Sequence, residues 1–156
     1  MTRRSCTIWK NFYQLIYAEF EDNVYAAIEA GESLDAEQLS DKWAEVFKTY
    51  RGDSVVWLDG ARYQWASISH LYYDYYVYKY ATDVCYAAAI CKAITEKQPN
   101  AVENYLDFLK LGSSDSAVNL LSVAGVNPLD ESTYKDAMEY FSDLVDEYEA
   151  SIDARQ

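Results

Sequence analysis

Apolar side chains recur every three or four positions along most of this chain, a spacing typical of amphipathic helices. The first such segment predicts one long helix, because its apolar positions share one face: Ile8, Trp9, Phe12, Ile16, Phe20, Val24 and Ile28. Gly31 ends the pattern, as glycine often does at the C-terminal end of a helix.

A complete start signal for a second helix follows. Asp35 and Gln38 have the spacing of a capping box, and Leu34 is placed to pack on Leu39 across the cap. This second helix is expected to continue until Gly52 closes it.

The middle of the chain is expected to change from a loop to one long helix. Residues 53–61 have no helical period and predict a loop or short extended piece, with three apolar side chains held against the core: Val55, Val56 and Trp57. From Arg62 to about Lys97 no glycine or proline interrupts the chain. This stretch therefore predicts a single long helix that ends before Pro99.

Three further helices are expected in the remainder of the chain. Asn100 is placed to cap a helix that reaches Gly112, and the serines at 113–116 precede another that reaches Gly125. A last amphipathic helix is expected from about 133 to 153. With about six helices and no alternation typical of strands, the sequence predicts an all-α helical bundle that forms one domain over residues 1–156.

Composition and charge exclude several classes of partner. The chain has 156 residues, 51% of them hydrophobic, which is enough for one sizeable core. Its formal net charge of −13 would repel phosphate backbones and anionic lipid, so neither nucleic acid nor a membrane surface is an expected partner. Three cysteines without a CxxC pair favour reduced thiols and therefore a cytoplasmic protein.

The densest chemical signal lies between Trp65 and Ala89, where the only histidine of the chain is surrounded by tyrosines. On the predicted helix, one stripe would contain His70, Tyr73, Val77 and Tyr80, with Tyr76 beside it. Such a face could bind a peptide backbone or donate hydrogen bonds to a developing oxyanion. The same spacing also fits an aromatic core with a satisfied histidine. Packing is the expected role of three other tyrosines: Tyr72, Tyr75 and Tyr86.

Other catalytic arrangements find little support in the sequence. A single histidine cannot form the HExxH motif, and Ser67 stands three residues before His70 where a di-iron bundle would need a carboxylate, so no metal site is expected within the chain. The acidic runs that contain Glu19 and Glu21, and residues 143–149, are interpreted as solvated faces. Serines 113, 114 and 116 lack a GxSxG elbow, and Gly-rich phosphate loops are absent.

Several motifs in order resemble the C-terminal part of oligoendopeptidase F, a family of zinc peptidases related to thimet oligopeptidase. They are YAEFE at 17–21, the Gly31-Glu32-x-Leu34 turn, Trp65-x4-His70 with LYYDYYVYKYAT, the alanines at 87–89, YLDFLKLGSSD and LLSVAGVNP. Together they span most of the chain. The resemblance implies an all-α piece of a larger α-helical catalytic domain that lines a channel for short peptides.

The resemblance also implies roles for particular residues. His70 matches the family histidine that faces the scissile carbonyl, and Tyr73 and Tyr80 are the implied catalytic tyrosines. Tyr76 and Tyr78 are the implied substrate-binding tyrosines. In this family zinc is held by HExxH and a glutamate on a following helix, so the metal and its ligands would belong to a part upstream of this chain. Asp83 departs from the pattern, since the family usually has glycine there.

Two functional hypotheses follow from the sequence. In the first, the chain is the substrate-channel portion of a zinc metalloendopeptidase, inactive alone and completed by a zinc-bearing half. In the second, it is a free-standing, non-catalytic helical module that binds a peptide or a partner protein. A helical bundle without a site is the third alternative.

Overall fold

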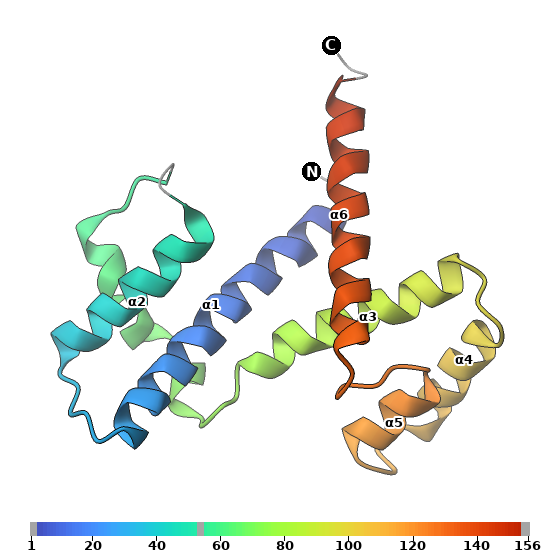
Figure 1. Ribbon diagram of the computed structural model, residues 1–156, viewed down its shortest axis with the longest axis horizontal. Coiled ribbons are helices and arrows are strands. Elements are labelled where there is room, and N and C mark those ends of the chain that lie inside the picture. The colour runs from blue at the N-terminus through green and yellow to red at the C-terminus, as the bar shows by residue number, and fades with distance from the viewer. Residues whose placement is uncertain (1–2, 53–54, 154–156) are drawn as a thin grey trace. The chain divides into compact units, whose positions relative to one another are not determined.

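The computed structural model describes the backbone of residues 3–52 and 55–153 and the side chains of residues 13–52 and 55–153. Every regular element in these ranges is helical (Figure 1). There are six α-helices and two 3-10 helices: α1 (Arg3–Glu29), α2 (Ala36–Arg51), η1 (Asp59–Ser67), η2 (Ser69–Tyr72), α3 (Tyr78–Thr95), α4 (Ala101–Leu111), α5 (Ala117–Val123) and α6 (Glu131–Asp153). The predicted all-α class is confirmed.

Contacts within the chain divide it into two compact units, residues 1–81 and 82–156. The division falls inside α3, directly after Ala81. That residues 1–156 make a single domain stays a prediction.

The ends of α1 and α2 follow the sequence signals. Gly31 adopts φ +87 after α1, a left-handed conformation that glycine accepts without steric strain. Before α2, the Asp35 carboxylate accepts from the Gln38 backbone N–H at 2.9 Å, and the Gln38 side chain accepts from the Asp35 N–H at 2.9 Å. The predicted capping box is therefore present. Gly52 caps the other end of α2 with φ +68.

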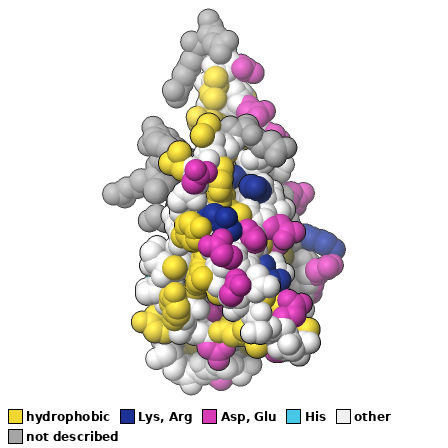
Figure 2. Space-filling model, turned by 90° about the vertical axis from the view of Figure 1, so that its left-hand side faces the viewer, with side chains coloured by type: hydrophobic (Ala, Val, Ile, Leu, Met, Phe, Trp, Pro, Cys, Tyr) yellow, Lys and Arg dark blue, Asp and Glu magenta, His cyan; other side chains and the backbone are white. Residues whose placement is uncertain are grey.

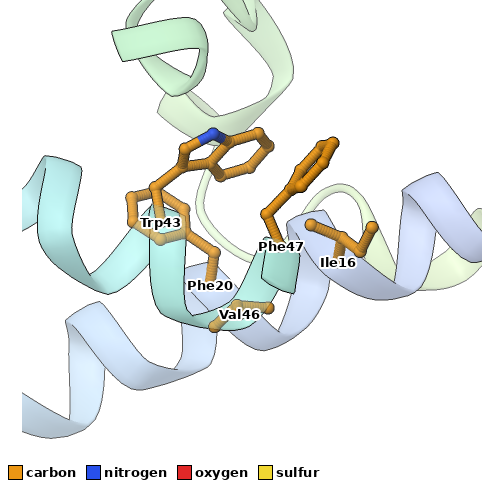
Figure 3. Packing of buried hydrophobic residues seen from close by; sticks show 5 residues of the cluster. All are labelled: Ile16, Phe20, Trp43, Val46 and Phe47. Atoms are coloured by element: carbon orange, nitrogen blue, oxygen red, sulfur yellow. The ribbon is translucent and has the colours of Figure 1, made fainter. Parts of the chain in front are cut away.

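The hydrophobic core of the first unit lies where α1 packs on α2. Figure 3 shows its buried side chains between the two helices: Ile16, Phe20, Trp43, Val46 and Phe47. The Trp43 indole is completely buried, and the Phe20 ring meets it edge-on with a centroid separation of 5.4 Å. Side chains of this size contribute roughly 1.5–3 kcal/mol each when fully buried. This core is the frame on which the next segment is held.

The predicted long helix over 62–97 is wrong in its first half. Residues 59–67 and 69–72 form the 3-10 helices η1 and η2, residues 73–77 form no helix, and α3 begins only at Tyr78. The physical reason is visible in the side-chain contacts to α2. Trp43 donates from Nε1 to the Ala61 carbonyl at 3.1 Å, and Trp65 donates from Nε1 to Ser40 Oγ at 3.0 Å. Aromatic and serine side chains have weak helix propensity, so such tertiary contacts override it.

Two further expectations about loops and caps need correction. Of the apolar side chains at 55–57, Trp57 packs on the core, but Val56 is 86% exposed and Val55 is also exposed. These two valines are therefore not held against the core, and the prediction that they would be is wrong. Asn100 does precede α4, but in a left-handed conformation with no side-chain cap bond.

The second unit has its own small core. It contains Ile90 from α3 with Ala124 and Val126 after α5. Lys92 on α3 forms ion pairs with Asp136 and Glu139 on α6, and these carboxylates raise its pKa. Ser116, the last of the serines expected to precede this helix, caps α5 by accepting from the Asn119 N–H at 3.3 Å.

Acidic residues outnumber basic ones in the chain, 26 to 13. On the face in Figure 2, Asp and Glu side chains (magenta) are spread widely and basic side chains (dark blue) are few, in accord with the net charge of −13. Among the described helices, none is both long and apolar enough to cross a bilayer. Cys85 and Cys91 are free thiols, and burial raises the pKa of Cys85; Cys6 lies outside the described side chains.

Candidate functional site

An aromatic cluster forms around His70 within the first unit. We define the His70 cluster as His70 on η2, Tyr73 and Tyr76 in the following turn, and Tyr80 on α3. The imidazole stacks on the Tyr76 ring with a centroid separation of 5.1 Å and an interplanar angle of 27°. The Tyr80 and Tyr73 rings lie 6.0 Å and 6.2 Å from the imidazole. The four side chains therefore converge.

Tyr76 occupies the middle of the His70 cluster. Its ring contacts those of Tyr73 and Tyr80 edge-on, each at a centroid distance of 5.7 Å. Its hydroxyl oxygen accepts from the Tyr80 hydroxyl at 3.0 Å. The Lys79 ammonium lies 3.5 Å from the Tyr76 ring centroid, in a cation–π contact. Tyr76 is thus held by a stack, two ring edges and a cation.

The sequence predicted this convergence for the wrong reason. His70, Tyr73, Val77 and Tyr80 do not share one helical stripe, since they come from η2, a non-helical turn and α3. Val77 is fully buried, so it does not belong to the same face as the rings. The turn at 73–77, and not helical periodicity, brings the histidine to the tyrosines.

The His70 cluster lies at the surface and is not an aromatic core. His70 is exposed, Tyr73 is 59% exposed and Tyr80 is 36% exposed. Tyr73 has no hydrogen-bond partner for its hydroxyl among the described residues. Buried tyrosine hydroxyls normally find a partner, whereas a tyrosine at the surface can leave its hydroxyl to solvent. Chemically, the cluster offers an imidazole and phenol hydroxyls that donate to carbonyl oxygens.

The remaining tyrosines of the segment behave differently from one another. Tyr78 is 52% exposed and makes none of the described ring contacts, so the structure does not bring it into the His70 cluster. Tyr72 is 62% exposed and donates to the Ala66 carbonyl at 3.1 Å, which contradicts its expected packing role. Tyr75 and Tyr86 do pack, against Tyr25 and Tyr134 respectively.

Glu21 is the residue that the sequence interpretation missed. It was predicted to lie on a solvated face, but its side chain is only 3% exposed. Its Oε1 atom accepts from the Tyr75 backbone N–H at 2.8 Å. Burial raises the pKa of Glu21, the Tyr75 N–H lowers it, and the Asp74 carboxylate raises it. The signal was available, because Glu21 lies four residues after Tyr17 and three before Val24, on an apolar stripe.

The turn next to the His70 cluster has an unusual backbone. Asp74 and Tyr75 have φ values of +46 and +50, in the left-handed region that residues other than glycine rarely adopt. The Tyr75 ring packs on the Tyr25 ring at 4.7 Å, one turn along α1 from Glu21. Helix α1 therefore holds this turn through two contacts.

The described residues do not fit a self-contained metal site. No group of three His, Cys, Asp or Glu side chains gathers in the part of the chain that the structure describes. The sequence itself contains one histidine, so a two-histidine ligand set cannot come from these 156 residues.

Comparison with known proteins places this architecture in a family. The model of Peptidase family M3 matches residues 1–140. Oligopeptidase PepF of Bacillus subtilis (strain 168) is 36% identical over 138 residues, which cover 88% of this chain and 21% of that protein. The chromosomal oligoendopeptidase F of Lactococcus lactis subsp. cremoris is 32% identical over 142 residues, which cover 91% of this chain and 24% of that protein.

A solved structure agrees with these sequence matches. The crystal structure of oligoendopeptidase-F from Enterococcus faecium superposes with a TM-score of 0.85 and 37% sequence identity, over 92% of this chain and 27% of that one. The chain thus spans about a fifth to a quarter of the length of these relatives. The predicted resemblance is confirmed, and the chain belongs to peptidase family M3.

Proposed function

We propose that this chain supplies the aromatic wall of a peptide-binding channel in an oligoendopeptidase of family M3. The observation that carries the proposal is the convergence of His70, Tyr73, Tyr76 and Tyr80, all of them exposed except the half-buried Tyr76. Membership of a family whose matched relatives are named oligopeptidases and oligoendopeptidases supports short peptides as the substrate class. Peptides offer a row of carbonyl oxygens, and hydrogen-bond donors on a surface suit them.

Within this proposal His70 and Tyr73 donate hydrogen bonds to the carbonyl at which a peptide is cleaved. Donors aimed at the position where negative charge develops stabilise the transition state more than the substrate. The hydroxyl of Tyr80 donates to Tyr76, which leaves the Tyr76 hydrogen free to turn toward a ligand. Tyr80 then acts in the reaction through this pair, and Tyr76 binds substrate. Tyr78, exposed but outside the cluster, would contact a peptide further along the channel.

No group of zinc ligands gathers among the residues that the structure describes, and the sequence has one histidine. We therefore assign the binding of the zinc expected of the family to a zinc-bearing part outside this sequence, which would be the partner that completes the enzyme. The chain alone is expected to be inactive. A cytoplasmic location fits the three cysteines without a CxxC pair, and neither nucleic acid nor a membrane is a proposed partner.

A free-standing binding module is the second candidate. The surface position of the His70 cluster favours it as well, because aromatic side chains with phenol hydroxyls bind peptides without any catalysis. The two functions differ in what the isolated chain can do. A module binds peptide by itself, whereas a channel wall needs its opposite side.

Peptide titration of the isolated chain separates these functions. The chain, His70→Ala, Tyr73→Phe and the control Tyr148→Phe, an exposed tyrosine of α6, would each be titrated with short peptides by calorimetry. The channel proposal expects no saturable binding and no stoichiometric zinc until the zinc-bearing part of a family enzyme is added. It then expects peptide cleavage that His70→Ala and Tyr73→Phe reduce and Tyr148→Phe does not. Saturable binding by the isolated chain, lost in the two cluster variants, would instead establish the module.

A further inference from the structure

We propose that Glu21 is a positioning residue, whose Oε1 atom holds the Asp74–Tyr75 turn in its left-handed conformation and so sets the stack of His70 on Tyr76. The geometric claim stands by itself. Its importance for peptide binding rests on the function proposed above.

Glu21 makes a long-range hydrogen bond to the backbone of the turn. Glu21 belongs to α1 and Tyr75 lies 54 positions later, yet the carboxylate accepts from the Tyr75 N–H at 2.8 Å. The Glu21 side chain is 3% exposed, whereas the Tyr75 side chain is 42% exposed. A buried acceptor from a core helix therefore reaches out to the backbone of a surface turn. The Tyr25 ring, at 4.7 Å from the Tyr75 ring, adds a second contact from the same helix.

The backbone conformation of the Asp74–Tyr75 turn needs stabilising contacts from elsewhere in the chain. Two consecutive residues with side chains, Asp74 and Tyr75, have positive φ values. Such conformations are sparsely populated and persist where surrounding contacts determine them. Neither residue is glycine, and both lie in the segment 73–77, which forms no helix or strand of its own. Among the described contacts, the Tyr75 N–H donates its hydrogen bond to the Glu21 carboxylate.

The turn and the His70 cluster are joined directly along the backbone. Tyr75 directly precedes Tyr76, whose ring carries the imidazole stack. Val77 follows and is fully buried, so the chain is fixed on that side as well. With residue 77 anchored, rotation of the backbone at residue 75 displaces the Tyr76 ring. The position of Tyr76 therefore depends on the bond at Glu21.

The protonation state of Glu21 is compatible with this role. Its Oε2 atom is buried and has no partner among the described residues, and burial raises its pKa. The charged groups and donors that face it are the Asp74 carboxylate and the Tyr75 N–H. A neutral carboxyl still accepts through its carbonyl oxygen, as a glutamine amide would. Glu21→Gln therefore keeps the acceptor, and Glu21→Met removes it while filling the same buried space.

His70 makes the test direct, because it is the only histidine of the chain and gives a single set of imidazole resonances. In the native stack the Tyr76 ring shifts these proton resonances away from their values in an unfolded chain. We expect Glu21→Met to lose more than half of this ring-current shift and Glu21→Gln to keep most of it. The control Glu32→Met makes the same change at an exposed position and should leave the spectrum unchanged. Circular dichroism verifies that each variant is folded.

A second measurement needs no substitution. Amide hydrogen exchange in the native chain should show the Tyr75 amide exchanging on the order of tenfold more slowly than that of Asp74, after correction for sequence. No acceptor for the Asp74 N–H lies among the described residues. Three results would each overturn the proposal: equal exchange at the two amides, a Glu21→Met variant that keeps the native ring-current shift of His70, or an equal loss of that shift in Glu21→Gln. None of these results depends on peptide binding, so they leave the proposed function to its own titration.

Discussion

The first unit contains two aromatic groups that differ in what surrounds them. In the core between α1 and α2, the Trp43 ring meets Phe20 at 5.4 Å and is completely buried. In the His70 cluster, the imidazole meets Tyr76 at 5.1 Å, but Tyr73 is 59% exposed. The ring distances are similar, and although the first pair is edge-on and the second stacked, both are favourable ring geometries; the exposure is what separates the two groups. Ring contact alone therefore does not distinguish a core from a site; the exposure of the polar atoms does.

The difference has an energetic consequence. Removing a buried ring creates a cavity and loses its transfer free energy, whereas removing an exposed ring does little to stability. Stability should then depend on the core, and ligand binding on the cluster. Variants of matched chemistry in the two groups test this distinction.

The largest effect is expected for Trp43→Ala. This change removes a fully buried ring and its hydrogen bond to the Ala61 carbonyl, and should lower the free energy of unfolding by about 3–5 kcal/mol. Tyr73→Ala is the matched change in the His70 cluster and should stay within about 0.5 kcal/mol of the native chain. Urea unfolding followed by circular dichroism measures both. Losses of similar size would show that the cluster is part of the core.

A smaller effect is expected for Val77→Ala, inside the cluster segment. Val77 is fully buried, and the substitution deletes the equivalent of two methylene groups, about 1.6 kcal/mol in all. Its neighbour Tyr78 is 52% exposed, so Tyr78→Ala should change the free energy of unfolding by less than about 0.5 kcal/mol. If urea unfolding showed a larger loss for Tyr78→Ala than for Val77→Ala, then Val77 would not be the buried residue of the two.

Glu21 should make stability depend on pH. Because burial raises its pKa in the folded state above that of the unfolded chain, the folded state binds more protons in the pH range between the two values. The native chain should therefore gain stability as the pH falls through the raised pKa, and lose it as the pH rises. Glu21→Gln cannot titrate, so it should lack this component.

The measurement is the free energy of unfolding of both proteins between pH 5 and pH 8. Their difference isolates Glu21, because other titrating groups are common to both. The free energies of unfolding of the native chain and of Glu21→Gln would then differ by an amount that changes with pH. A difference that stays constant over this range would contradict a raised pKa of Glu21.

The smallest effect on stability is expected for Tyr80→Phe. The bond from the Tyr80 hydroxyl to Tyr76 lies at the exposed surface, so its loss should cost less than about 0.5 kcal/mol. The ring contact with Tyr76 would remain. If thermal unfolding showed a loss well above that figure, the hydroxyl pair would have a structural role in addition to any role in binding.

Much of the helical architecture was predictable from local signals. The capping box of Asp35 and Gln38, the end of α1 at Gly31 and the Ser116 cap of α5 all act within a few residues of their position. Local sequence determines such features because the hydrogen bonds involved are local. The family resemblance was also carried by short motifs in order. The His70 cluster was anticipated in its members, apart from Tyr78, but not in its geometry.

Tertiary structure alone decided the path of residues 59–77. There, side chains of α2 and α1 form hydrogen bonds with Ala61, Trp65 and Tyr75. These bonds join positions 18 to 54 residues apart. A helical period cannot reveal such contacts, because it reports only neighbours within a turn or two. The partner of Glu21 has the same origin: its place on an apolar stripe indicates burial, but only the fold brings the Tyr75 N–H to its carboxylate. Sequence thus determined which residues could form the site, and folding determined how α1 holds them.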